Sequence, residues 1–232
     1  MNILESKNIN LLIDFDSTFV KVETLDILAE VCFGSDSNAV NNINDITNKA
    51  MNGEIPFDIA LKKRVTILKA NKKHINKTIT IIKDSISKSF YKNKDFFKKN
   101  AANCFIVSGG FKEIIFPIVK SFGFKDENVY GNEFIYKNNG EIKTINRDNP
   151  LAHKLGKIKI ANQINQNLSM NEYYKKNLII GDGFTDYEIK KFGGAEKFIQ
   201  FSENINRSIL NPLADHIAYS FDDVINYIQK NL

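Results

Sequence analysis

Two hydrophobic patterns divide the chain into strand-like and helix-like segments. Short continuous apolar runs, which suit buried parallel strands, stand at 9–13, 103–107, 177–180, 197–201 and 216–218. Longer stretches repeat an apolar residue every three or four positions, as amphipathic helices do. They predict helices at 23–33, 39–51, 56–69, 74–90, 92–99, 111–122, 153–166, 186–192, 204–210 and 221–230. Residues 128–145 predict strands around a turn at Asn138-Asn139-Gly140.

The order of these segments predicts the fold class. Strands alternate with helices from residue 103 onward, which is typical of a parallel sheet with right-handed crossovers. Residues 23–90, by contrast, carry helical patterns alone. We therefore expect a doubly wound, Rossmann-like α/β core built from residues 1–20 and 92–232. An all-helical cap, residues 21–91, would be inserted after the first strand, where it can act as a lid.

Composition narrows the class of protein. The 232 residues, 43% apolar and 25% charged, suffice for one globular domain with an insert. The net charge of +5 suits a small anionic substrate, and no basic stripe with interleaved aromatic residues indicates nucleic acid. No apolar run reaches membrane-spanning length, the start has no signal-peptide pattern, and Cys32 and Cys104 suit reduced core positions. We expect a cytoplasmic protein without a membrane partner.

Polar residues follow three of the predicted strands. Because the carboxyl ends of parallel strands meet at one edge of a sheet, these side chains should converge there. Each alone has a plain structural explanation, such as a turn, a helix cap or a solvated lysine. The ordered set is far more specific: Asp14, Asp16, Ser108, Gly109, Lys157, Asp182 and Asp186.

This set suits phosphoryl transfer with Mg²⁺. The carboxylates of Asp14 and Asp182, with the backbone carbonyl of Asp16, offer the oxygen ligands that Mg²⁺ takes. A carboxylate can attack phosphorus to give an aspartyl phosphate, and Lys157 would offset the repulsion between the two anions. Asp16 can protonate the leaving alkoxide and later deprotonate water. Ser108 and the N–H of Gly109 can hold phosphate oxygens.

At these residues the chain resembles the haloacid dehalogenase-like superfamily of phosphohydrolases. The stretch Ala50–Phe57, continued by Leu61–Val65, resembles the cap segment of the phosphoserine phosphatase family. The resemblance implies a Mg²⁺-dependent hydrolase of phosphoserine that acts in serine biosynthesis.

The resemblance also implies roles for individual residues. Asp14 would be the nucleophile, Asp16 the general acid and base, Asp182 a Mg²⁺ ligand and Asp186 its support, with Ser108 and Lys157 on the phosphate. In the cap region it implies that Glu23 takes the substrate's ammonium, Arg64 its carboxylate, and that Met51 and Phe57 cover it. Charge agrees for Arg64, because guanidinium can grip a carboxylate bidentately.

Several alternatives stay open at this point. Thr185 stands where the family usually has Asn, and the helix register decides whether Lys154 or Lys157 reaches the site. Glu23 has the alternative of a first-turn helix acid, and Arg64 that of a surface cation. The rival functions are a phosphatase or phosphotransferase for another small phosphorylated metabolite, and a non-catalytic phospholigand-binding module.

Overall fold

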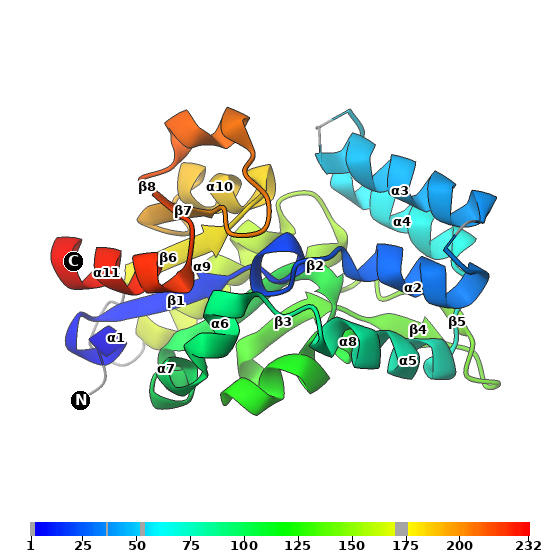
Figure 1. Ribbon diagram of the computed structural model, residues 1–232, viewed down its shortest axis with the longest axis horizontal. Coiled ribbons are helices and arrows are strands. Elements are labelled where there is room, and N and C mark those ends of the chain that lie inside the picture. Colours follow the sequence, from blue (N-terminus) through cyan, green and yellow to red (C-terminus); the bar gives the residue numbers. More distant parts are fainter. Residues whose placement is uncertain (1–2, 36, 52–53, 170–175) are drawn as a thin grey trace.

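A six-stranded parallel sheet forms the centre of the computed structural model, which describes residues 3–35, 37–51, 54–169 and 176–232 (Figure 1). The strand order is β3-β2-β1-β6-β7-β8, so the chain winds outward in both directions from the β1–β6 pair. This confirms the predicted doubly wound α/β fold class. The strands are β1 (Ile9–Ile13), β2 (Cys104–Phe111), β3 (Val129–Asn132), β6 (Lys176–Gly181), β7 (Lys197–Phe201) and β8 (His216–Ala218).

Helices cover both faces of the sheet because alternate strand residues point to opposite sides. Leu11 and Ile13 pack in one apolar cluster with residues of α8 (Lys112–Val119) and α11 (Phe221–Asn231). Leu12, between them, packs in a second cluster on the other side, with residues of α9 (Gly156–Ser169) and α10 (Phe184–Lys191). The central strands are therefore buried on both faces, which explains their unbroken apolar sequence.

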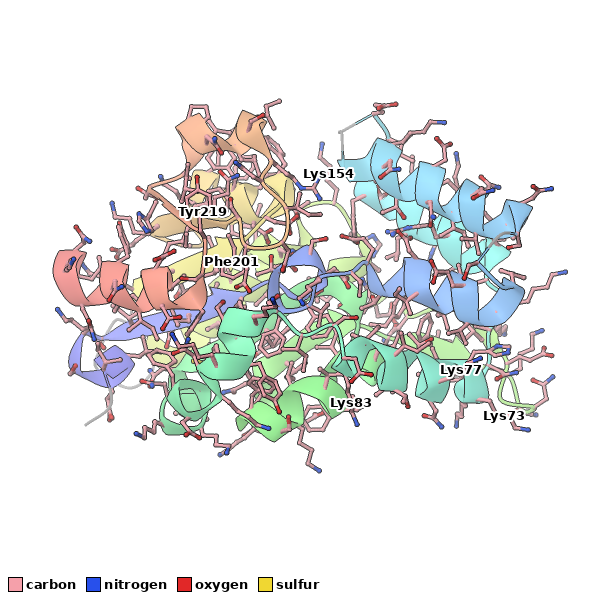
Figure 2. All side chains as sticks on the ribbon, viewed as in Figure 1. Lys73, Lys77, Lys83, Lys154, Phe201 and Tyr219 are labelled. Atoms are coloured by element: carbon pink, nitrogen blue, oxygen red, sulfur yellow. The ribbon has the colours of Figure 1, made fainter. Side chains whose placement is uncertain are left out.

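Between β1 and β2 the chain forms a group of helices: α2 (Thr24–Phe33), α3 (Asn38–Met51), α4 (Phe57–Ile67) and α5 (Lys72–Lys83). Helix α2 packs against α3 and α5, α3 packs against α4, and α5 lies on α8 of the core (Figure 1). On α5, Ile75 and Ile79 are buried, whereas Lys73, Lys77 and Lys83 point outward (Figure 2). The predicted helical insert thus takes the form of a four-helix group at one end of the molecule.

The chain leaves the sheet and returns to it through two segments that lie side by side. Val20 pairs with Ile86 in an antiparallel bridge, and the N–H of Lys21 donates to the carbonyl of Ser85 at 2.8 Å. The predicted continuous helix 74–90 is therefore wrong: α5 ends at Lys83, and α6 (Lys88–Lys92) is separate. The ring of Phe90 on α6 packs on Phe221 of α11, with centroids 4.8 Å apart.

The remaining elements are short. β4 (Phe134–Tyr136) and β5 (Ile142–Ile145) form the predicted hairpin, and α1 (Ile3–Ser6) and α7 (Lys94–Lys99) flank the core. The expected helix at 204–210 is wrong, because a 3₁₀ turn at Ser208–Leu213 stands there instead. Among the described helices, none combines the length and the apolar character needed to cross a lipid bilayer.

Candidate active site

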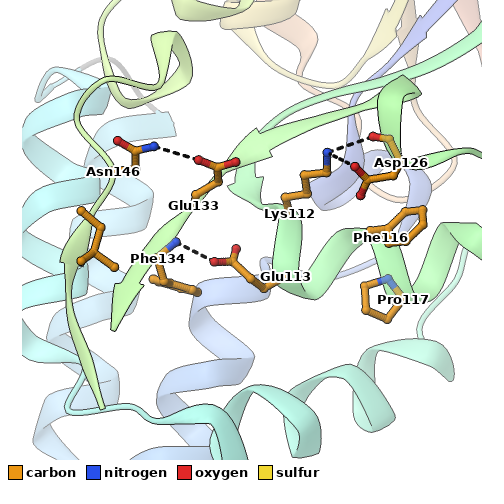
Figure 3. Close-up of a pocket in the computed structure, with 9 residues that line it drawn as sticks. Lys112, Glu113, Phe116, Pro117, Asp126, Glu133, Phe134 and Asn146 are labelled. Atoms are coloured by element: carbon orange, nitrogen blue, oxygen red, sulfur yellow. Dashed lines mark hydrogen bonds and ion pairs between the residues drawn. The ribbon is translucent and has the colours of Figure 1, made fainter. Parts of the chain in front are cut away.

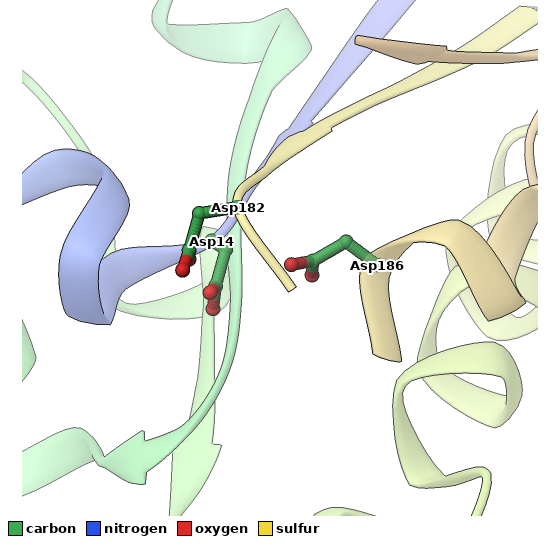
Figure 4. Close-up of side chains that lie close together, drawn as sticks. All are labelled: Asp14, Asp182 and Asp186. Atoms are coloured by element: carbon green, nitrogen blue, oxygen red, sulfur yellow. The ribbon is translucent and has the colours of Figure 1, made fainter. Parts of the chain in front are cut away.

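Three buried carboxylates meet where β1 and β6 end. The two strands pair with Ile13 opposite Ile180, and the N–H of Asp14 donates to the Ile180 carbonyl at 2.9 Å. This pairing places Asp14 beside Asp182, and the first turn of α10 adds Asp186 (Figure 4). One carboxylate oxygen from each residue lies within 4.8 Å of the others. Segments far apart in sequence therefore converge at the switch point of the sheet, as predicted.

Lys157 joins two of these carboxylates. Its Nζ donates to Asp14 Oδ1 at 2.8 Å and to Asp186 Oδ1 at 2.7 Å. Burial alone would lower the pKa of Lys157, but the two carboxylates outweigh that effect and raise it. The exposed Lys154 precedes α9 and lies outside the cavity that Lys157 lines, so Lys157 is the lysine that reaches the acids.

Gly156 allows α9 to deliver this lysine. A Cβ at Gly156 would lie 2.2 Å from the carbonyl oxygen of Pro150, too close for any other residue. The first turn of α9 therefore packs directly against the preceding 3₁₀ turn, Pro150–Ala152. The helix predicted from His153 accordingly begins later, at Gly156.

Hydrogen bonds hold the other acids in place. Asp182 accepts from Thr18 Oγ1 at 3.2 Å and from Arg207 Nε at 3.0 Å, while Asp186 Oδ2 accepts from the N–H of Gly183 at 3.1 Å. Burial, followed by the charge of Asp14, raises the pKa of Asp182, and the same causes raise that of Asp186 to about 7. A divalent cation among these groups would relieve their repulsion.

Arg207 is a site residue that the sequence patterns did not single out. It follows β7 on a segment that was expected to be helical, and pattern reasoning offers no reason for it to reach Asp182. Composition held one signal: only three of the 32 basic Lys and Arg residues are Arg, namely Arg64, Arg147 and Arg207. Arg is favoured over Lys where a carboxylate must be gripped in a fixed geometry.

Asp16 lies on a tight turn rather than on an extension of the strand. β1 ends at Ile13, and a tight turn at Phe15–Phe19 follows, with an extended backbone at Asp16 and with Ser17 in the left-handed region at φ 56°. Asp16 Oδ1 accepts from the N–H of Thr24 at 2.9 Å, and both Asp16 and Asp14 line one cavity. Burial, with a further contribution from Asp14, raises the pKa of Asp16 to about 7. A carboxyl with such a pKa can carry a proton at neutral pH.

Ser108, Gly109 and Gly110 form a bulged end of β2 beside these acids. The pairing register with β3 shifts between Val107 and Phe111, and Ser108 Oγ accepts from the N–H of Gly110 at 2.9 Å. Gly109 lies directly under the ring of Phe57 on α4: a Cβ there would stand 2.5 Å from Phe57 Cζ. The helical group therefore contacts the polar turn at a glycine.

The helices also complete the wall of the cavity, which measures about 90 Å³. The helical group and the residue before α2 contribute Phe57, Arg64 and Glu23 to the lining. The core contributes the acids, Ser108, Gly109, Lys157 and, from α10, Thr185. Arg64 is only 4% exposed, so it is not a surface cation. Burial and the nearby charges of Asp16 and Asp182 raise the pKa of Glu23, whose Oε1 accepts from Ser17 Oγ at 2.8 Å. Met51 ends α3, and its side chain lies outside the described residues.

A separate cavity of about 420 Å³ opens on α8 near the β4–β5 hairpin (Figure 3). Lys112, Glu113, Glu133 and Asn146 line it, with Lys112 bound to Asp126 at 3.0 Å and Asn146 to Glu133 at 2.8 Å. None of the residues predicted to act on phosphate borders this cavity. The chemistry-bearing residues therefore gather at the sheet edge instead.

A six-stranded parallel sheet with an acid cluster at its switch point and a helical group beside it defines a haloacid dehalogenase-like hydrolase. No protein-family model matches the chain. A chloroplastic phosphoserine phosphatase of Arabidopsis thaliana is 30% identical over 213 residues, which cover 92% of this chain and 69% of that protein. The chain therefore belongs to the phosphoserine phosphatase family, whose members are phosphoric monoester hydrolases.

Solved structures agree with this assignment. A phosphoserine phosphohydrolase-like protein from Francisella tularensis superposes with a TM-score of 0.82 at 27% identity, covering 95% of this chain and 99% of that chain. A phosphoserine phosphatase solved as an analogue of its phospho-aspartyl intermediate gives a TM-score of 0.74 at 25% identity, covering 94% and 97%. Both likenesses extend over the sheet and the helical group alike.

Proposed function

We propose that this protein hydrolyses L-phosphoserine to serine and inorganic phosphate, with Mg²⁺ as cofactor. The observation that carries the proposal is the buried Arg64 in the wall of a cavity that also contains Lys157 and the acid cluster. Phosphoserine has a phosphate, a carboxylate and an ammonium. The cavity offers a complementary group to each: Lys157 and Ser108 to the phosphate, Arg64 to the carboxylate and Glu23 to the ammonium.

The donor set fits a magnesium ion. Asp14 and Asp182 would be carboxylate ligands, with the backbone carbonyl of Asp16 as a third, and hard oxygen donors are what Mg²⁺ prefers. Asp186 would support them from behind, since Lys157 Nζ joins its Oδ1 to Asp14 Oδ1. Bound Mg²⁺ would supply positive charge that neutralises phosphate and nucleophile as they approach each other.

In the first half of the reaction, Asp14 would attack the phosphorus. Lys157 holds Asp14 Oδ1, which leaves Oδ2 to form the new P–O bond while the bond to the serine oxygen breaks. Asp16 would give its proton to that leaving oxygen, a role supported by its pKa of about 7. Ser108 and the N–H of Gly109 would hold the phosphate oxygens.

In the second half, water would attack the aspartyl phosphate. Asp16, now ionised, would take a proton from this water as its oxygen bonds to phosphorus, and the bond from phosphorus to Asp14 breaks. Phosphate is released and Asp14 is regenerated. The related phosphatase solved as a phospho-aspartyl intermediate analogue supports this two-step course.

The helical group would act as a cap. We place it close to the expected range of 21–91, with its end at the bridge between Val20 and Ile86, because Phe90 already packs on the core. Phe57 would cover the turn Ser108–Gly110, where phosphate would bind, and Met51 and Thr185 would contact the substrate. The free thiols of Cys32 and Cys104 fit a reducing, cytoplasmic setting, where the hydrolysis would be a step of serine biosynthesis.

Phosphate release from a panel of phosphometabolites, with Mg²⁺ or with EDTA, tests the proposal. We expect the highest kcat/KM for L-phosphoserine and no release in EDTA. A different best substrate would reassign the enzyme within its class, and transfer to an added alcohol instead of water would make it a phosphotransferase. Binding of phosphoserine without any release would indicate a ligand-binding module and overturn the proposed hydrolysis.

A further inference from the structure

Arg64 is buried, and the described residues leave most of its hydrogen-bonding capacity unused. It is 4% exposed on α4, and its Nη1 donates to Thr47 Oγ1 at 3.2 Å. Its Nε is buried and has no hydrogen-bond partner among the described residues. A guanidinium carries five N–H donors in a fixed plane. Arg64 lines the cavity, and among the described residues the contact with Thr47 is the one hydrogen bond that orients its guanidinium there.

Thr47 links Arg64 to a carboxylate on a third helix. Thr47, on α3 and 3% exposed, donates from Oγ1 to Asp26 Oδ1 on α2 at 2.7 Å. The carbonyl of Ile43 lies 3.1 Å from the same hydroxyl, but the shorter contact to a carboxylate is the stronger one. A hydroxyl has one donor and can also accept, so Thr47 accepts from Arg64 while it donates to Asp26.

We propose that Thr47 and Asp26 are positioning residues that aim Arg64 at the substrate's carboxylate and so set selectivity for amino-acid phosphates. This inference rests on the proposed function. A direct pair between Asp26 and Arg64 would engage the guanidinium edge bidentately and block it. With the Thr47 hydroxyl between them, the carboxylate compensates a buried positive charge at a distance, and the edge that faces the cavity stays available to a ligand.

The contact chain also joins α2, α3 and α4, so a purely structural role must be distinguished. A structural role would lower activity on every substrate alike, through loss of folded protein or a looser cavity. A positioning role changes only the contribution of the carboxylate. The ratio of kcat/KM for phosphoserine to kcat/KM for phosphoethanolamine, which has the ammonium but no carboxylate, separates the two. Because both values come from one protein sample, the folded fraction cancels.

The experiment measures this ratio in Mg²⁺ for wild type, Thr47→Val, Thr47→Ser and Asp26→Asn. We expect Thr47→Val, which keeps the shape but loses the hydroxyl, to reduce the ratio about tenfold through a higher KM for phosphoserine. Thr47→Ser restores the hydroxyl and should stay within about twofold of wild type. Asp26→Asn, which keeps an acceptor but loses the charge, should fall between them. In an Arg64→Ala background, Thr47→Val should leave the ratio unchanged.

The outcomes separate this inference from the function on which it rests. If wild type fails to hydrolyse phosphoserine, the proposed function is wrong and this inference falls with it. If wild type hydrolyses phosphoserine but Thr47→Val affects both substrates equally, only the positioning role is overturned. An equal loss of the ratio in Thr47→Val with and without Arg64 would also overturn it, because the threonine would then act independently of the arginine.

Discussion

Arg207 binds Asp182 from the segment between β7 and the 3₁₀ turn Ser208–Leu213: its Nε lies 3.0 Å from Asp182 Oδ2. Asp182 is 3% exposed, and burial together with Asp14 raises its pKa, whereas Arg207 opposes that rise. The guanidinium therefore helps to keep a proposed Mg²⁺ ligand ionised. It also helps to fix the direction of the carboxylate, whose other oxygen accepts a hydrogen bond from Thr18 Oγ1.

Replacing Arg207 should make activity more sensitive to acid. In Arg207→Met the pKa of Asp182 rises further, so that at low pH less of this ligand is ionised. The acid limb of the pH–rate profile should move to higher pH, and activity at pH 6 should fall about tenfold, as expected for a lost charge-assisted hydrogen bond. Arg207→Lys, which keeps the charge, should shift the limb less. An unchanged acid limb in Arg207→Met would contradict this role.

Asp14→Asn should abolish turnover, because an amide is a poor nucleophile toward phosphorus and a poor metal ligand. We expect loss of phosphate release by at least about 10³-fold. The variant is nearly isosteric, so its thermal unfolding should show a folded protein. Near-normal hydrolysis by a folded Asp14→Asn variant would refute the assignment of the nucleophile.

Arg64→Ala should damage recognition of phosphoserine selectively. Loss of a charged hydrogen-bonded contact predicts a rise in KM of about 10- to 100-fold for phosphoserine. The KM for p-nitrophenyl phosphate, which lacks the carboxylate, should change much less. Arg147→Ala is a matched control, since Arg147 is exposed and does not line this cavity. Equal effects of Arg64→Ala on both substrates would rule out carboxylate recognition.

The metal-free protein should lose stability as pH rises. The folded pKa of Asp16 and of Asp186 is about 7, against a reference of 3.8 for the unfolded chain. An acid whose pKa is raised by folding binds more protons when folded, so the free energy of unfolding decreases as pH rises from about 4 through 7. Thermal unfolding in EDTA should show this decline, and Mg²⁺ should raise Tm more at pH 8 than at pH 6.

Asp16→Asn supplies the control for this pH effect. It removes one of the acids whose pKa folding raises, so the decline of Tm between pH 5 and pH 8 should be shallower than in wild type. A slope identical to that of wild type would show that Asp16 does not titrate in this range.

Gly109→Ala should disturb the packing of the helical group on the turn Ser108–Gly110. The new Cβ would stand 2.5 Å from Phe57 Cζ, so the ring must move. Overpacking of this kind costs about 1–3 kcal/mol, which predicts a loss of about tenfold in kcat/KM. The double variant with Phe57→Leu should recover part of the loss, because the smaller side chain makes room. No effect of Gly109→Ala would show that the ring and the turn need not be in contact.

Local patterns predicted the sheet well because its strands are buried on both faces. The apolar runs at Ile9–Ile13 and Lys197–Phe201 coincide with β1 and β7, and Asp14 and Asp182 lie together because adjacent parallel strands end at one edge. The resemblance to a known family supplied what patterns cannot, namely that Arg64 would turn toward the cavity rather than toward solvent.

The misses have tertiary causes. Ile82, Ile86 and Phe90 keep a spacing of four, so the pattern continues a helix where the chain in fact turns back to pair Ile86 with Val20. Near residue 204, side-chain contacts with distant segments take the place of a helix. Asn204 donates to the carbonyl of Thr18 at 3.0 Å, and Arg207 donates to Asp182. These contacts join residues 186 and 25 positions apart, and they leave no periodic trace in the sequence.

The paired segments that leave and re-enter the sheet have a consequence for how ligands exchange. Lys21 is hydrogen-bonded to Ser85, and the N–H of Ser87 donates to the carbonyl of Phe19 at 3.0 Å, so the two connections between the sheet and the four helices run side by side as one ribbon, while α5 also packs on α8. Phe57 and Arg64 share α4. In the proposed enzyme, the contact of Arg64 with the amino-acid end and the cover of Phe57 over the phosphate end would therefore loosen together, and serine and phosphate would gain access to bulk water in the same opening event.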